Sequence, residues 1–112
     1  MPKSIERTYS RYSREAVLLM ANLIRAARTE QKLTVKEVAE RAGISRGLVQ
    51  RIEKGDMKCE VGVVFEVATI VGVKLFGSDQ KALSQHIYRS EEKLALLPKA
   101  VRKTSRVIDD DF

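Results

Sequence analysis

Apolar residues recur every three or four positions through most of the chain, which is the spacing of helices that bury one face. Between residues 13 and 31 this spacing predicts a first helix. Ser13 is its expected N-cap, and Tyr12 and Val17 are placed to pack as a hydrophobic staple across that end. The buried face of this helix is expected to carry Ala16, Leu19, Met20, Leu23 and Ala27.

A second helix has the clearest start signal in the chain. Thr34 and Glu37 have the spacing of a capping box, in which each side chain accepts a hydrogen bond from the other residue's backbone N–H. Gly43 ends this helix after a few residues, and Ser45 then starts a third helix that ends before Gly55. Two short helices joined by a tight glycine turn form a helix-turn-helix unit. The positions that fit the packing of this unit are Val38, Ala39, Ala42, Gly43, Ile44, Val49 and Ile52.

Two further helices complete the predicted all-α fold. One covers roughly residues 61–71 and ends at Gly72, and the other begins near Ser78 and continues to the low 90s. After Pro98 the composition shifts to basic and then acidic residues. We therefore divide the chain into a basic N-terminal arm, a five-helix domain that includes the fifth helix, and an extended C-terminal tail, which are residues 1–12, 13–95 and 96–112.

The positive charge of the chain is concentrated in one half. Residues 1–59 contain 13 Lys and Arg against 7 Asp and Glu, whereas residues 60–112 contain 8 of each, so the whole excess of +6 lies in the first half. A basic half that also holds the helix-turn-helix indicates a polyanionic partner. The alternative is a basic surface that only keeps the protein soluble.

Several classes of protein are excluded or disfavoured by composition. A single Cys59 and a single His86 exclude a disulfide framework and a closed zinc site within one chain, and we expect an incidental thiol and a solvated imidazole. Without a phosphate-binding glycine loop or a Ser/His/Asp set, an enzyme is the poorest interpretation, and no cofactor is expected. The polar start does not resemble a secretory signal, and the apolar run over residues 61–73 is too short to span a bilayer. We therefore expect a cytoplasmic protein.

Gly47 is the unexpected residue of the third helix, because glycine costs a helix about 1 kcal/mol relative to alanine. With Val49 set inward and roughly 100° per residue, Gly47 and Arg51 point outward. Glycine on this face lets the helix backbone approach a partner closely; the alternative is a poor helix residue tolerated by packing. If the partner is DNA, Arg46 and Arg51 are candidates for guanine, and Gln50 is a candidate for adenine.

The run "LTVKEVAERAGISRGLVQRIEKG", residues 33–55, resembles the Cro/repressor type of helix-turn-helix, also called the xenobiotic-response-element family. The resemblance extends over about residues 15–76. It implies a domain of five helices whose third helix enters the major groove of double-stranded DNA. It also implies that phosphate contacts come from Ser45, Lys54 and Lys58.

The same resemblance implies a structural ion pair and reveals one departure from the family. Glu53 lies near the inward side of the third helix, and the family pairs this glutamate with an arginine of the first helix, which here is Arg28. Many members begin the second helix with a glutamine that contacts the DNA backbone, and here that position is Val35. Basic residues near the N-terminus are expected to compensate for the missing glutamine contact to the DNA backbone. They are Arg7, Arg11 and Arg14.

DNA binders of this kind usually dimerise across a palindrome, so we expect a homodimer. The surface expected to dimerise is on the fifth helix, with Leu83, Ile87 and Leu94. The alternative is that these residues complete the core of the monomer.

Arm, domain and the ending "LALLPKAVRK…DDDF" together resemble HipB-like antitoxins, which are encoded beside HipA-like serine/threonine kinase toxins. This resemblance implies a repressor of its own operon that also binds a kinase partner. The docking element would be Phe112 as an anchor with Asp109, Asp110 and Asp111 against a basic surface. Three alternatives stay open: an acidic solubilising tail, a stand-alone or phage-type repressor, and a protein-interaction adaptor that does not bind DNA.

Overall fold

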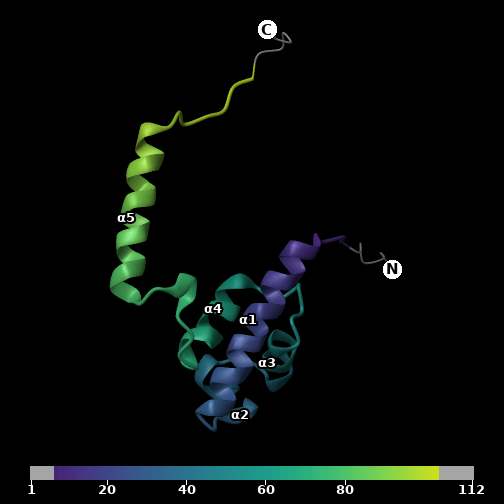
Figure 1. The fold of residues 1–112 in the computed structure, drawn as a ribbon. Coiled ribbons are helices and arrows are strands. Elements are labelled where there is room, and N and C mark those ends of the chain that lie inside the picture. Colours follow the sequence, from purple (N-terminus) through teal and green to yellow (C-terminus); the bar gives the residue numbers. More distant parts are fainter. Residues whose placement is uncertain (1–6, 104–112) are drawn as a thin grey trace. The chain divides into compact units, whose positions relative to one another are not determined.

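The computed structural model describes residues 7–103, and these residues form helices and no strand (Figure 1). The helices are α1 (Arg11–Glu30), α2 (Val35–Ala42), α3 (Arg46–Glu53), α4 (Val61–Ile70) and α5 (Gln80–Leu96), with a 3-10 turn η1 (Leu75–Gly77) before α5. The predicted all-α fold class is confirmed. The chain divides into two compact units, unit 1 up to Gly77 and unit 2 from Ser78 onward.

Unit 1 holds the core. α2 packs on both α3 and α4, and α1 packs on the same two helices, across which it lies in Figure 1. The fully buried side chains at the centre of these contacts are Ile24, Val38, Val49, Val67 and Val71. Because these residues are small and aliphatic, the helices can approach closely without any aromatic ring in the buried core.

Two expectations for α1 are wrong. The N-cap is Ser10 rather than Ser13: the Ser10 hydroxyl oxygen accepts a hydrogen bond from the Ser13 backbone N–H at 3.1 Å. The helix therefore begins at Arg11 and includes two of the three arginines expected to act from a loose arm beside DNA, Arg11 and Arg14. The earlier start is supported by an ion pair one turn apart, between Arg11 Nε and Glu15 Oε2 at 3.0 Å.

The buried face of α1 also differs from the prediction. Ala21 and Ile24 are buried, whereas Leu19 and Leu23 are 58% and 45% exposed. Apolar residues occupy more than one side of this helix, so a spacing of three and four residues fits more than one face. The face that turns inward is selected by the fit against α3 and α4, which the local pattern does not contain.

The capping box of α2 is present as predicted. The Thr34 hydroxyl accepts from the Glu37 N–H at 3.0 Å, and Glu37 Oε1 accepts from the Thr34 N–H at 2.8 Å. The hydrogen bond that the Glu37 carboxylate accepts from the Thr34 backbone N–H lowers the pKa of Glu37, and the interaction with the Thr34 side chain lowers it further. A lowered folded-state pKa means that the carboxylate stabilises the fold at neutral pH, and that this stabilisation is lost as the pH falls through that pKa.

The turn between α2 and α3 depends on Gly43. Its φ of 70° lies in the left-handed region that a residue with a Cβ rarely adopts. In this conformation the Ile44 N–H donates to the Ala39 carbonyl at 3.0 Å and closes the end of α2. Ser45 then caps α3 by accepting from the Leu48 N–H at 3.1 Å. The helix-turn-helix unit therefore has the geometry that its sequence predicted.

Unit 2 consists of α5 and the residues after it. Asp79 caps the helix by accepting from the Ala82 N–H at 2.8 Å. α5 has no buried side chain, and the division at Gly77 leaves it outside the unit that holds the core.

Candidate functional site

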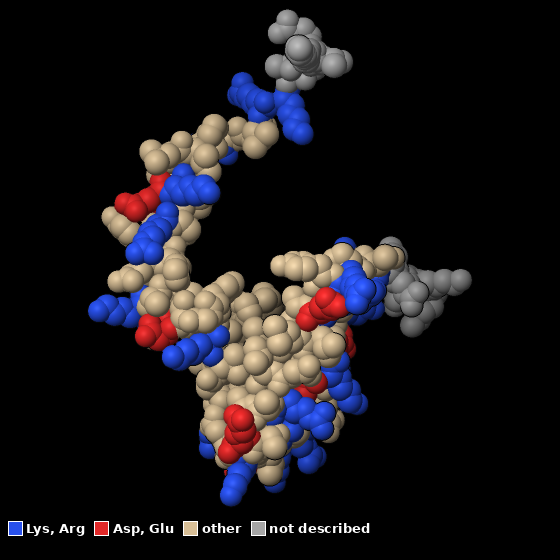
Figure 2. All heavy atoms as spheres, in the orientation of Figure 1, with Lys and Arg blue, Asp and Glu red and all other residues tan. Residues whose placement is uncertain are grey.

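Lys and Arg side chains gather on the surface where α2 and α3 lie, as Figure 2 shows by comparison with Figure 1. Within α3, Val49 and Ile52 face the core and are buried. The residues on the opposite side of α3 and at its end are exposed, as the helical geometry predicted. They are Arg46, Gly47, Gln50, Arg51 and Lys54. We call these five residues the α3 face.

Gly47 is not needed for packing inside the described part of the chain. A Cβ added to this residue would have one neighbour, the Ser45 hydroxyl oxygen at 3.9 Å, which is ordinary van der Waals contact or looser. The backbone of Gly47 is helical and does not need the conformational freedom of glycine either. Neither sterics nor backbone geometry within the domain requires a glycine at this position.

The two neighbours of Gly47 in sequence differ in their surroundings. Arg46 is exposed at the first turn of α3, where its guanidinium group is free to reach outward. Leu48 is half-buried and packs against the core cluster, so it contributes to the interior more than to the α3 face. Ser45 caps α3, and Lys58 is exposed in the loop after the helix.

Arg28 and Glu53 lie in contact between α1 and α3. Arg28 Nε donates to Glu53 Oε2 at 2.6 Å and Arg28 Nη2 donates to Glu53 Oε1 at 3.0 Å, so the pair is bidentate. Arg28 Nη1 also donates to the Leu33 carbonyl at 2.9 Å. The two side chains are 16% and 7% exposed, and the hydrogen bonds to Glu53 raise the pKa of Arg28. The pair therefore ties α1, the turn before α2 and the end of α3 together.

A second ion pair, which the sequence analysis did not anticipate, lies at the end of α3. Arg51 Nε donates to Asp56 Oδ2 at 2.7 Å, and Asp56 Oδ1 accepts from the Lys58 backbone N–H at 2.8 Å. The hydrogen bond from Arg51, with the one from the Lys58 N–H second, lowers the pKa of Asp56. The five-residue separation exceeds one helical turn, and only the turn at Gly55, with φ of 78°, brings the two side chains together.

A hollow of about 230 Å³ opens beside the α3 face. Its lining includes the Arg28–Glu53 pair, with Val35 from α2, Gln50 and Lys54 from α3 and Arg25 from α1. Arg25 and Lys54 are exposed, so two cationic side chains from different helices border one opening. Sequence reasoning missed Arg25; the available signal was its position one turn before Arg28 on the same helix.

Val35 is the residue that stands where the resembling family has glutamine, and it is half-buried and packs against the core cluster. No polar side chain therefore extends from the start of α2 into the hollow at that position. Arg25 and Lys54 supply positive charge beside the same opening.

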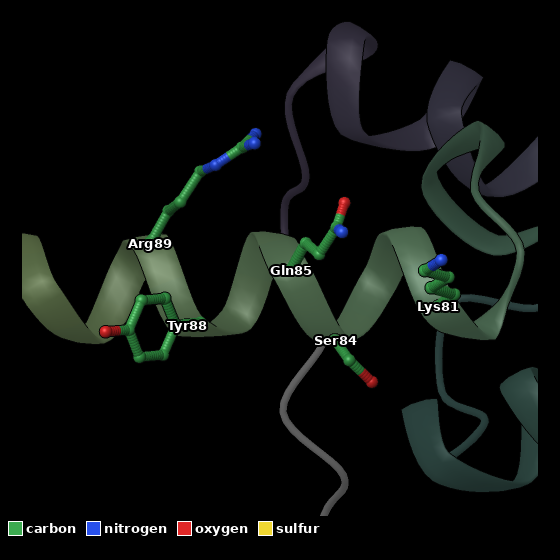
Figure 3. Close-up of a pocket in the computed structure, with 5 residues that line it drawn as sticks. All are labelled: Lys81, Ser84, Gln85, Tyr88 and Arg89. Carbon is green, nitrogen blue, oxygen red and sulfur yellow. The ribbon is translucent and has the colours of Figure 1, made fainter.

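A different hollow lies along α5, lined by Lys81, Ser84, Gln85, Tyr88 and Arg89 (Figure 3). All five side chains come from a single helix and extend outward from it. Of the residues expected to form the dimer surface, Leu83 is half-buried, and Ile87 and Leu94 are 50% and 66% exposed. The apolar side of α5 is thus largely open to solvent in one copy of the chain.

Asp109, Asp110, Asp111 and Phe112 lie outside the described residues. Within residues 7–103 no three His, Cys, Asp or Glu side chains are grouped so that they could hold a metal ion. Burial raises the pKa of the Cys59 thiol, which makes this cysteine less reactive than a free one at neutral pH.

Comparison with known proteins finds a similarity within the compact part of the chain. Residues 24–77 match the family model described as helix-turn-helix, and the matched segment ends where unit 1 ends. A search of curated proteins found no match. None of the described helices combines the length and the apolar character that crossing a membrane requires.

Proposed function

We propose that this protein is a sequence-specific DNA-binding transcriptional repressor, and the match of residues 24–77 to the helix-turn-helix family model supports this proposal. The α3 face enters the major groove of double-stranded DNA. The observation that carries the proposal is Gly47, which lies at the centre of an exposed face with hydrogen-bond donors around it and no neighbour that requires a glycine. A helix backbone without a Cβ at this point can lie deeper in the groove.

The residues of this surface divide into two roles. Arg46 and Arg51 present paired donors that match O6 and N7 of guanine, and Gln50 presents the donor and acceptor that match adenine. The second group contacts phosphates and positions the protein without reading sequence. It consists of Ser45, Lys54, Lys58 and, in addition to the residues expected from the sequence, Arg25.

Replacing Arg51 with alanine tests the base-reading role. We expect the affinity for the preferred duplex to fall by about 10- to 100-fold, with relaxed preference at one base pair, because a bidentate arginine–guanine contact is lost. The preferred duplex is first obtained by selection from a pool of randomised DNA. Fluorescence anisotropy with that duplex and its single-base variants then gives the affinity and the preference.

Lys58→Ala is the matched control, because it removes one positive charge near the same end of α3. It should weaken binding to all duplexes alike and reduce the slope of log affinity against log salt by about one unit. An Arg51→Ala variant that keeps the wild-type base preference would contradict the base-reading role proposed for the α3 face. A wild-type protein without steep salt-dependent binding would favour the adaptor instead.

The repressor is proposed to act as a homodimer on a palindromic operator, with half-sites about 34 Å apart. One helix-turn-helix reads only a few base pairs, so two copies are needed for a site that is rare in a genome. The association surface is the apolar side of α5. Ile87 and Leu94 are half or more exposed on this helix, which has no buried side chain in a single copy.

Within this class, we propose the antitoxin role, in which the dimer represses its own operon and binds a HipA-like kinase through the residues after α5. The support is the resemblance of the arm, the domain and the basic-then-acidic ending to HipB-like antitoxins. We expect a kinase to co-purify in equal amount with the tagged chain from its native cell, and deletion of residues 99–112 to remove it. A kinase retained after the deletion would place docking elsewhere, and recovery without any companion protein would indicate a stand-alone repressor.

A further inference from the structure

The ion pair between Arg51 and Asp56 lies at the edge of the α3 face, and its position does not suit a stabilising role. The Arg51 side chain is 51% exposed and that of Asp56 is 31% exposed. Ion pairs at such exposure contribute little to folding, because water screens the charges and two side chains must be held in one geometry. The acidic charge also lies beside the surface of the α2 and α3 region, on which Lys and Arg side chains gather (Figure 2). The hydrogen bond from the Lys58 N–H requires an acceptor oxygen at residue 56 but no negative charge, so the charge needs a further explanation.

Two hydrogen bonds to the main chain, one from the backbone N–H and one to the carboxylate, hold Asp56 in place. Its own N–H donates to the Arg51 carbonyl at 3.1 Å, and its Oδ1 accepts from the Lys58 N–H at 2.8 Å. Gly55, with its positive φ, makes the turn that brings the main chain back to the end of α3. The carboxylate is thus fixed relative to α3, and its second oxygen, Oδ2, is directed at Arg51.

The ion pair uses only Nε of Arg51 and leaves its two terminal nitrogens, Nη1 and Nη2, available. Asp56 Oδ2 engages Nε at 2.7 Å, and among the described residues no hydrogen bond engages Nη1 or Nη2. The end of the guanidinium group, with its two Nη nitrogens, therefore stays free to donate in parallel. Guanine presents O6 and N7 as two acceptors side by side in the major groove, which is the arrangement that this free edge fits.

On this geometry, we infer that Asp56 is a positioning residue that holds Arg51 in the orientation in which it reads guanine. The inference rests on the proposed DNA-binding function. This role is expected to raise the affinity for the specific site and to lower the affinity for other DNA. Arg51 loses less side-chain freedom when it binds the correct base, which favours the specific site. The carboxylate repels phosphates near the loop, which disfavours all other DNA. Asp56 thus increases the ratio of specific to non-specific affinity from both directions.

Asp56→Asn is the sharpest variant. The amide oxygen can still accept from the Lys58 N–H and keep the turn, whereas the amide lacks the charge that holds Arg51 Nε. We expect discrimination between guanine and other bases at the Arg51 position to fall by about tenfold, which is the lower part of the range for a bidentate contact. At the same time the affinity for a scrambled duplex should rise. A purely structural residue would weaken both kinds of binding together.

Two controls complete the experiment. Glu60→Gln removes the same charge from the same loop, but Glu60 makes no side-chain capping hydrogen bond, so it should raise non-specific affinity and keep the discrimination. In an Arg51→Ala background, Asp56→Asn should cause no further loss of discrimination, because it acts through Arg51. Unchanged discrimination in Asp56→Asn, or an equal further loss in the Arg51→Ala background, would overturn the inference. A wild-type protein that prefers no duplex would overturn the proposed function itself.

Discussion

Replacing Glu53 with alanine is expected to lower the free energy of unfolding by about 3 kcal/mol or more. The reason is the burial of its partner. Arg28 is 16% exposed and makes two hydrogen bonds to Glu53, and without them its positive charge would remain inside the domain with only the Leu33 carbonyl as a partner. Chemical denaturation followed by circular dichroism measures the change. Binding of DNA should also weaken, because the pair holds α1 against the helix that carries the α3 face.

Two comparison variants separate the effect of a buried unpaired charge from the loss of an ion pair as such. Glu15→Ala breaks the exposed pair with Arg11 and should change the free energy of unfolding by less than about 1 kcal/mol. A double variant with methionine at residues 28 and 53 removes both charges and should be much closer to wild type than Glu53→Ala. If Glu53→Ala and Glu15→Ala unfold alike, the pair does not stabilise the domain.

The second large effect is expected on α5. Glutamate at both Ile87 and Leu94 should convert the protein to a monomer and reduce affinity for a palindromic operator by about 100-fold or more, because two linked half-site contacts become independent. Affinity for a single half-site should stay near that of the wild type. Both side chains are at least half exposed, so the substitutions leave the core of unit 1 intact. Analytical ultracentrifugation and binding to whole and half operators measure the two effects.

Gln85→Glu is the matched control for α5, since it adds a negative charge to the same helix about 160° away from Ile87. It should leave both the dimer and the operator affinity unchanged. A double variant that stays dimeric would show that the subunits associate through a different surface. A wild-type protein that is already monomeric on its operator would contradict the proposed homodimer.

The features that the sequence predicted well are those whose physical cause is local. Thr34 and Glu37 form their capping box within four residues, and Gly43 is needed for a conformation of its own backbone. The orientation of α3 follows in the same way, because one inward residue, Val49, fixes the direction of all others through the helical repeat. For these elements, the residues that determine the structure all lie within one short segment of the sequence.

Features that require contacts between distant segments were not predicted. The inward side of α1 depends on α3 and α4, so the exposed Leu19 and Leu23 could not be distinguished from buried residues by spacing. Arg25 gains its place beside Lys54 only when α1 and α3 pack together. The Arg51–Asp56 pair depends on the turn at Gly55, which lies after the end of α3 and therefore outside a helical projection of α3. The geometry of α3 was therefore predicted from the sequence, whereas the neighbours that other segments supply to it were missed.

The absence of a buried side chain in α5 also bears on how such a regulator would respond to its own abundance. A single helix of 17 residues is only marginally stable in water, so its folding is coupled to whatever covers its apolar side. If a second copy provides that cover, helix formation and subunit association become one equilibrium. Occupancy of a two-fold symmetric operator then rises with about the square of the monomer concentration at low levels. A small decrease in protein would then release the promoter sharply, and the chain would act as a threshold sensor of its own supply.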